Sequence, residues 1–463
     1  MSDIAQLLRS HQADLSWQRE FYEDLHEHPE LSGHEQETSQ RILKELQRFD
    51  CEIVSPIGGF GAVAVFRNGE GPTALMRADF DALPIKEETG VPFASTRIRP
   101  GADGTMTGIM HACGHDMHTT ALMGVCAILD AHREAWSGTF LALFQPSEEN
   151  AQGANAMVAD GLVNRVPRPD ICLGQHVMPG RAGEVQTMPG AQFAACDSIR
   201  IRLYGRSAHG SMPHKSVDPT YMAAMIIVRL QGLVAREVSP DDFAVISVGT
   251  LRSGSTNNII PDTAELVLNC RFYDNNLKRR VYAAIKRVVF AESAASGAPR
   301  EPEMEFFAHG DLIDNDPDMF DAIRPNFDRV FGADSVDARR TTVSEDFSNL
   351  ARAFGSPYLF WVVGCTPQEQ WDRAVAENRV ELDVPVNHMS TFLPEYEPTV
   401  DAATKAGATA VLTYLGVDTP KPRQAPVGHG AHRPTPPDNQ RVTGKRSAPT
   451  GRQSAGGTPD FNI

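Results

Sequence analysis

The sequence is poor in cysteine and contains no long apolar run. Its 463 residues include 7 cysteines, scattered over positions 51, 113, 126, 172, 196, 270 and 365. So sparse and odd a set predicts reduced thiols and excludes a disulfide framework. No stretch approaches the roughly 18 apolar residues of a membrane-spanning helix, and residues 1–17 lack the basic and then apolar order of a secretory signal. We therefore expect a cytoplasmic protein without a membrane partner.

Positive charge is also in short supply. The chain has 43 Lys and Arg against 59 Asp and Glu, a net charge of −16, which argues against a nucleic acid as partner. A locally positive pocket remains compatible with this charge, because bound divalent cations would reverse the local sign. The hydrophobic fraction of 41% is typical of a soluble globular protein, and the length exceeds what a single core supports. Two folded units are therefore expected.

The end of the chain lacks large apolar residues. Residues 418–463 are rich in Pro, Gly and Arg and cannot build a core, so they are predicted to form a disordered basic tail. For this tail we favour an extension without a role over an interaction arm.

Hydrophobic periodicity divides the rest of the chain. Up to residue 192, helices are predicted at 16–28, 35–49 and 119–132, and strands at 62–66, 73–77, 139–144 and 170–174, with the first two strands as a hairpin or as neighbours. From residue 193 the order becomes strand, helix, strand, strand, helix, with strands at 198–205, 244–251 and 264–273 and helices at 219–236 and 278–292. This order predicts a small inserted sandwich. A helix at 318–331 and a strand at 357–364 return to the first architecture.

One short segment concentrates metal-binding side chains. Residues 111–118 (HACGHDMH) hold three histidines, a cysteine and an aspartate, while Glu148 and Glu149 follow the strand predicted at 139–144. Zinc and similar metals bind thiolate, imidazole and carboxylate together, and a carboxylate left off the metal can act as a base. Ligands of open α/β sheets bind where strands end. The pattern predicts a metal-dependent hydrolase.

Taken singly, the candidate ligands have simpler interpretations. Cys113 alone would be a small buried residue, Glu149 a solvated surface charge, and His176 a core histidine with its hydrogen bonds satisfied. For His388 by itself, the evidence for a ligand role is weaker still. Cys113 and His115 are separated by one residue, so in an extended or turn geometry both can reach one metal or a shared pair. The combination favours a metal site over these alternatives.

Motifs spread over residues 1–416 resemble the M20 metallopeptidase family, in the amidohydrolase branch with hippurate hydrolases, N-acyl-amino-acid amidohydrolases and plant auxin-conjugate hydrolases. The matching segments are 28–31 (HPEL) with Glu35 and Thr38, 77–84 (RADFDALP), 111–118 (HACGHDMH), 144–149 (FQPSEE), 175–177 (QHV), 205–214 (GRSAHGSMPH) with Asp218 and Pro219, 258–262 (NIIPD), 344–348 (SEDFS) and 387–388 (NH). The resemblance implies an α/β fold, with a zinc-exopeptidase-like catalytic domain at 1–192 and 300–417. An inserted smaller α+β sandwich at 193–299 would be the lid and dimerisation domain.

The resemblance also implies roles for individual residues. The metal ligands would be Cys113, His115, Glu149, His176 and His388, holding two divalent metal ions, zinc or manganese, with Cys113 as the bridge. Glu148 would be the catalytic base. Asp116 and His118 would orient ligands, and we interpret Asp79 and Asp81 as structural. In the lid, His209 would stabilise the oxyanion of the tetrahedral intermediate, although a loop histidine is the simpler interpretation. Asn258 and Arg271 would bind the substrate carboxylate; for Arg271, pairing on the strand surface is an equal alternative.

The implied function is hydrolysis of the amide bond of N-acyl amino acids or similar small amides by metal-activated water, in a homodimer or higher homo-oligomer. A dipeptidase or carboxypeptidase using the same chemistry is the first alternative, and a catalytically silent binding scaffold is the second. The Cys-Gly-His form of the motif at 113–115 favours the amidohydrolase branch. The sequence departs from the branch at Gln175, where Leu is common, and after His388, where residues 389–392 (MSTF) replace a small residue, Pro and an aromatic. We expect both positions to line the pocket, so the acyl-group preference of the branch does not carry over to this chain.

Overall fold

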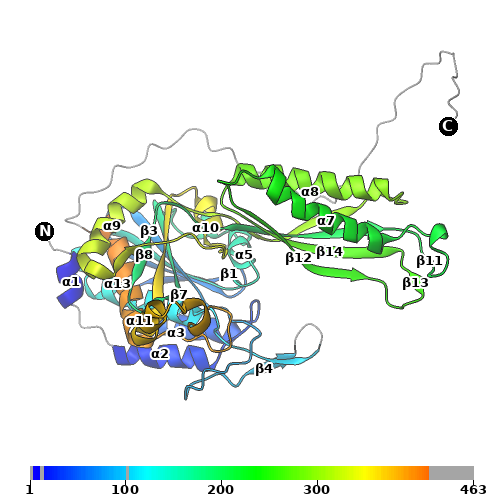
Figure 1. Ribbon diagram of the computed structural model, residues 1–463. Helices are drawn as coiled ribbons and strands as arrows, with labels where there is room; N and C mark the ends of the chain where they lie inside the picture. The colour runs from blue at the N-terminus through cyan, green and yellow to red at the C-terminus, as the bar shows by residue number, and fades with distance from the viewer. Residues whose placement is uncertain (1–3, 11–14, 101–103, 417–463) are drawn as a thin grey trace, which may run out of the picture.

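The computed structural model describes residues 4–10, 15–100 and 104–416, and Figure 1 shows them as two bodies lying side by side. The larger body comprises the chain up to 193 and from 313 onward, and it contains an eight-stranded sheet. The smaller body comprises 195–310 and contains a four-stranded sheet. The tail predicted at 418–463 lies outside the described residues. Within the described ranges, no helix is long and apolar enough to cross a membrane.

The helices and strands of the larger body come from both ends of the chain. Its helices are α1 (Ile4–Ser10), α2 (Leu15–Glu27), α3 (Gln36–Leu46), α4 (His115–Ala131), α5 (Gly153–Ala159), α6 (Leu162–Arg165), α9 (Pro317–Phe331), α10 (Phe347–Phe354), α11 (Gln368–Ala376), α12 (Val380–Asp383) and α13 (Tyr396–Leu415). Its strands are β1 (Glu52–Ile57), β2 (Gly61–Asn68), β3 (Thr73–Asp79), β4 (Ile98–Pro100), β5 (Met106–Gly108), β6 (Gly138–Gln145), β7 (Ile171–Arg181), β8 (Val185–Thr187), β9 (Gly190–Phe193), β16 (Ile313–Asn315), β17 (Ser335–Asp337) and β18 (Tyr358–Thr366).

The eight-stranded sheet has the order β1-β2-β6-β3-β7-β18-β8-β17. Its central strands β6, β3, β7 and β18 are parallel and almost wholly buried, because helices cover both faces. Helices α2, α4, α9 and α13 pack on one face and α5 and α10 on the other. Successive residues of β7 illustrate this burial, since Cys172 faces the second layer and Leu173 the first. The predicted α/β fold is confirmed.

One expected pairing was wrong. We predicted the strands at 62–66 and 73–77 as a hairpin or as neighbours, but β6 lies between β2 and β3. The connection at 69–72 crosses the start of β6, where Thr139 N donates to Pro72 O at 2.9 Å. A Cβ added to Gly138 would meet Pro72 O at 2.2 Å, so this crossing requires a glycine.

The smaller body is an antiparallel sheet with helices on one face. Its strands are β10 (Ala195–Tyr204), β11 (Ala208–His209), β12 (Ala244–Ser253), β13 (Ile259–Ile260), β14 (Thr263–Phe272) and β15 (Glu303–Gly310), and its long helices are α7 (Pro219–Glu237) and α8 (Asn275–Ala295). The sheet order is β12-β14-β10-β15, and β14 alternates between buried and half-buried residues. The buried face packs on α7 and α8 in a separate core. The element order matches the predicted sandwich, to which the structure adds two short strands, β11 and β13, and the strand β15, which carries the smaller body beyond the predicted end at residue 299.

Candidate metal centre

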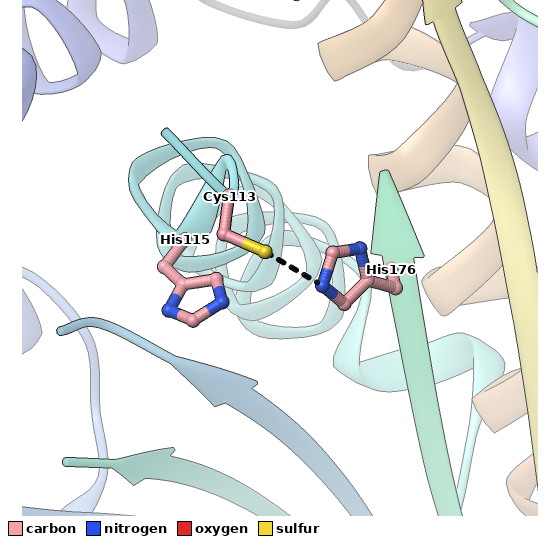
Figure 2. A group of neighbouring side chains, drawn as sticks. All are labelled: Cys113, His115 and His176. Carbon is pink, nitrogen blue, oxygen red and sulfur yellow. Dashed lines mark hydrogen bonds between the residues drawn. The ribbon is translucent and has the colours of Figure 1, made fainter. Parts of the chain in front are cut away.

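Cys113 and His115 are held at the start of α4. The helix begins at His115, earlier than predicted, and Gly114 precedes it with φ of 80°. A Cβ at Gly114 would meet Val177 Cγ2 at 2.4 Å, so only glycine fits this close approach to β7. Figure 2 shows Cys113 and His115 side by side, with His176 of β7 facing the thiol. Cys113 Sγ lies 3.5 Å from His176 Nε2.

His176 has one nitrogen directed at this group. Its Nδ1 is 2.7 Å from Val177 O, and because a carbonyl can only accept, Nδ1 carries the hydrogen. Nε2 therefore presents a lone pair toward Cys113. Burial and the neighbouring His118 lower the pKa of His176 well below its usual range. The side chain is thus in the neutral form that binds metals. It lies within β7, not after a strand as predicted.

Glu149 and His388 complete a second group around the same cysteine. His388 Nε2 lies 3.4 Å from Glu149 Oε2, and the backbone of His388 is tied to the cysteine segment through its N–H, which donates to Ala112 O at 2.8 Å. The donor atoms of Cys113, His115 and His176 lie within 4.8 Å of one another, and so do those of Cys113, Glu149 and His388. Two metal-capable groups therefore share Cys113.

Unpaired polar atoms support the fit of this donor set to divalent cations. Among the described residues, His115 Nε2 and Glu149 Oε1 are buried without a hydrogen-bond partner and lie 3.8 Å apart. Buried polar atoms left unpaired are costly, and cations between them would satisfy both. The mixture of thiolate, imidazole and carboxylate suits zinc and related metals.

Asp81 links two of the candidate ligands. Its Oδ1 lies 3.1 Å from His115 Nδ1, and its Oδ2 accepts from Glu149 N at 3.0 Å and from Ser32 Oγ at 2.7 Å. His115 Nδ1 therefore donates, and Nε2 is left facing the group. Our interpretation of Asp81 as merely structural was wrong, because the carboxylate orients a candidate ligand. Its position just after the end of β3 was the available sequence signal.

His118 and Asp116 differ in what they contact. His118 Nδ1 is 2.5 Å from Asp79 Oδ1, and His118 Nε2 accepts from Val177 N at 2.8 Å, next to His176. His118 thus supports the β7 segment, as expected of an orienting residue. Asp116 instead pairs with His26 at 2.6 Å, so it has no hydrogen bond with a candidate ligand. The prediction that Asp116 orients a ligand directly was wrong.

Glu148 lies beside the candidate ligands in a buried acidic environment. Its Oε2 is 4.0 Å from His115 Nε2. Burial, followed by the charges of Glu345, Glu149 and Asp346, raises the pKa of Glu148 well above its usual range. The buried guanidinium of Arg77 balances part of this charge, since it pairs with Glu345 at 2.7 Å and with Asp346 at 3.2 Å. Glu148 can therefore hold a proton as well as accept one.

A cavity of about 570 Å³ joins this group to the smaller body. Cys113, Glu148, Glu149, His176 and His388 line one side, and the strands β10, β12 and β14 contribute the other. Arg271 lines that second side. Its Nε donates to Asn269 Oδ1 at 3.0 Å, and its Nη1 is buried without a partner.

Four residues that we linked to this site do not line the cavity. His209 and Asn258 are exposed around β11 and β13, at the end of the smaller body away from the larger one (Figure 1). His209 Nδ1 is 2.8 Å from Ser211 Oγ. Gln175 is buried against Trp361, whose Nε1 donates to it at 3.0 Å, and Met389 is exposed. The expectation that Gln175 and Met389 line the pocket was wrong, because neither belongs to the residues that line the cavity.

His26 anchors the start of α4 through two carboxylates. The buried ring pairs with Asp116 at 2.6 Å through Nδ1 and with Glu87 at 3.0 Å through Nε2. Burial alone would lower the pKa of His26, but the hydrogen bonds to Asp116 and Glu87 raise it to about 9. An imidazolium that donates twice is therefore the folded form.

Replacing His26 with glutamine should destabilise the protein in a pH-dependent way. Because the folded pKa is raised above the unfolded value, the contribution of His26 is fully present below pH 6.5 and disappears as the pH rises through about 9. We expect a loss of up to about 3 kcal/mol in the free energy of unfolding at neutral pH, measured by urea denaturation, with little difference above pH 9. His28→Gln, a partly exposed site after the same helix, is the control. An equal loss at every pH would contradict the charged pairing.

Comparisons with known proteins agree with this geometry. A profile described as peptidase family M20/M25/M40 matches residues 75–383. An N-acetylcysteine deacetylase of Bacillus subtilis is 34% identical over 351 residues, 75% of this chain and 88% of that protein. Thermostable carboxypeptidase 1 of Saccharolobus solfataricus is 30% identical over 364 residues, 77% of this chain and 89% of that protein. A crystal structure of a B. subtilis protein, described as a dinuclear metal binding peptidase from the M20 family, has a TM-score of 0.69 at 28% identity, covering 86% of this chain and 98% of that one.

Proposed function

The chain belongs to peptidase family M20/M25/M40, and we propose that it is an amidohydrolase of this family. Its reaction is the hydrolysis of the amide bond of N-acyl amino acids or similar small amides. The products are a carboxylate and a free amino acid. The observation that carries the proposal is the position of Glu148, a largely buried carboxylate outside both groups that share Cys113, at the wall of a cavity that members of those groups also line.

Cys113, His115, Glu149, His176 and His388 are the residues that would hold two divalent metal ions, with Cys113 as the bridge. When bound, such ions polarise the scissile carbonyl and lower the pKa of water. A thiolate among the ligands favours zinc, with manganese as the second candidate. Asp81 and Val177 O each contact the Nδ1 atom of a histidine, so the rings of His115 and His176 are oriented with Nε2 toward the metal-capable group.

Glu148 accepts a proton from the attacking water and returns it to the leaving nitrogen. Both steps need a carboxyl group with a pKa closer to neutrality than usual, and burial among Glu345, Glu149 and Asp346 moves it in that direction. The proposed division of labour between the two neighbours is supported by the Glu149 carboxylate, which lies near Cys113 and His388, whereas Glu148 belongs to neither group that contains Cys113.

In the smaller body, which we propose to be the lid, Arg271 binds the substrate carboxylate. Its unpaired Nη1 supports this role. For His209 and Asn258 to reach an active site, either the lid must move or a second copy of the chain must supply them, which fits the homodimer or larger homo-oligomer that we propose. We further propose that the enzyme works in the cytoplasm.

A metallo-exopeptidase is the second candidate function, because thermostable carboxypeptidase 1 is comparably similar. The Cys-Gly-His sequence at 113–115 favours the amidohydrolase. A silent scaffold is the least favoured alternative, since none of the proposed ligands nor Glu148 is missing.

Paired substrates separate the two enzymatic functions. We expect a metal-reconstituted, reduced sample to hydrolyse N-acetyl-L-methionine with kcat/KM at least roughly tenfold above that for glycyl-L-methionine, which releases the same amino acid. N-benzoyl amino acids extend the series to larger acyl groups. A preference for the dipeptide would assign the chain to the peptidases, and silence on both series would contradict the proposal.

A further inference from the structure

A partly buried charged network lies where the chain passes between the two bodies. The chain enters the smaller body through β10 and leaves it through β15, and these two strands pair with each other. His309 of β15 and Asp197 of β10 meet at this point, with Nδ1 to Oδ1 at 2.5 Å. The Asp197 side chain is only 5% exposed.

The network extends into both bodies. On the side of the smaller body, Asp197 also accepts from Lys278 Nζ at 2.6 Å and from the hydroxyl of Tyr282, both on α8. On the side of the larger body, His309 Nε2 lies 3.3 Å from Asp311 Oδ1, and Asp311 pairs with Arg352 of α10. A continuous chain of charges therefore joins α8 to α10 through the two connecting strands.

A bulge in β15 directs His309 into this network. Cys196 pairs with Gly310 and Ser198 with Phe307, so Asp197 alone lies opposite both Ala308 and His309. Ala308 occupies the left-handed region, with φ of 48°, an unfavourable conformation for a residue with a Cβ. Bulges re-aim side chains, and local strain at such a position persists only where surrounding contacts impose it.

The same strand positions face the cavity on their other side. Cys196 and Ser198 flank Asp197 along β10, Ala308 and Gly310 flank His309 along β15, and all four line the cavity. Side chains alternate along a strand, so the network and the cavity wall are opposite faces of one two-stranded connection.

The charge state of His309 matches its contacts. Only an imidazolium can donate to Asp197 and Asp311 at once, and these two hydrogen bonds raise the pKa of His309 to about 9. Burial opposes ionisation of Asp197, but His309 and Lys278 lower its pKa below the usual value. Burial of Tyr282 raises its pKa, so the phenol remains a donor.

We propose that the contacts running from Asp197 through His309 and Asp311 to Arg352 of α10 form a latch that fixes the angle between the two bodies, which makes His309 a positioning residue for the cavity wall and for Arg271. The proposal rests on the proposed function only in treating the cavity as the substrate site. Without the latch, the smaller body samples more open orientations. The cavity that binds substrate is then formed for a smaller fraction of the time.

The test compares His309→Gln and Arg352→Gln, the second of which removes the contact with the larger body, with a matched control. Glu305→Gln removes another ion pair between the same two strands, Arg200 with Glu305 at 2.6 Å, farther from the junction. A fluorophore pair attached through non-natural amino acids at Ala291 on α8 and at Leu382 on α12, both exposed, reports the distance between the bodies by single-molecule energy transfer. The measurement uses the full-length, metal-loaded protein without substrate.

We expect both latch variants to shift and broaden the distance distribution and Glu305→Gln to leave it unchanged. In the assay that detects wild-type turnover, the latch variants should raise KM by roughly tenfold while kcat changes little, because a smaller competent fraction weakens apparent binding. Unaltered distributions in both variants, even with lower melting temperatures, would overturn the latch. If the wild type shows no turnover, the proposed function fails, and the distance distributions still decide the latch.

Discussion

Replacing Glu148 with glutamine is expected to lower kcat by roughly 10²- to 10⁴-fold, the range for loss of a general base. Glutamine keeps the shape of the side chain but cannot take up a proton. The amide also relieves the repulsion from Glu345, Glu149 and Asp346 that raises the pKa of Glu148, so folding should not suffer. Turnover of N-acetyl-L-methionine and metal content by mass spectrometry should be measured on the same sample.

Metal content distinguishes a lost base from a lost ligand. Glu148 belongs to neither group around Cys113, although its carboxylate also lies within 4.8 Å of donor atoms of His115 and Glu149. Because the proposal leaves Glu148 off the metals, we expect the variant to retain wild-type metal stoichiometry. Glu148→Asp keeps the carboxyl group at a shorter reach and should have intermediate activity. Retention of more than about a hundredth of wild-type turnover by Glu148→Gln would remove the residue from the role of base.

Much of the fold could be predicted because its signals are local. The helices at 16–28 and 219–236 and the strands at 139–144 and 357–364 each have their own periodicity, and all occur within two residues of the predicted ends. The partner of a strand is not a local property. The segment at 62–66 carries no information that β6, about 75 residues later, will lie between it and β3, so the hairpin was wrong.

The candidate ligands could be found from sequence because chemistry restricts them. Glu149 follows the apolar strand β6, His176 lies within the apolar strand β7, and Cys113 and His115 stand at the start of the apolar helix α4. The ends of parallel strands meet at one edge of the sheet, which is where ligands of open α/β sheets bind. Residues that act through hydrogen bonds gave weaker signals. Asp81 contacts His115 across 34 positions, and His309 reaches Asp197 across 112, through a bulge that no local pattern indicates.

The smaller body shows a different limit of sequence reasoning. The motif around His209 resembles its family counterpart. A sequence motif, however, does not indicate how far the end of the smaller body lies from the cavity. The structure separates the two. Arg271 was the less certain of the two carboxylate-binding candidates, and it is the one that lines the cavity.

Replacing Cys113 with serine is expected to lower metal affinity by at least roughly a hundredfold, since loss of a partner behind a ligand already costs 10- to 100-fold. Both metal-capable groups depend on Cys113, so both sites should be weakened together. The stoichiometry should fall below that of the wild type, and turnover should fall with it. Metal content after dialysis and activity under reducing conditions are the measurements.

Cys196→Ser is the matched control, because Cys196 is a second buried cysteine in the same cavity but lies in neither metal-capable group. Without a cation, burial and the charges of Glu149 and Glu148 raise the pKa of Cys113 well above its usual value, so the thiol alone would stay protonated. A thiolate there is therefore a consequence of metal binding. Metal uptake by the wild type should accordingly release a proton that the Cys113→Ser variant does not release, and equal proton release from both proteins would exclude Cys113 as the bridging ligand.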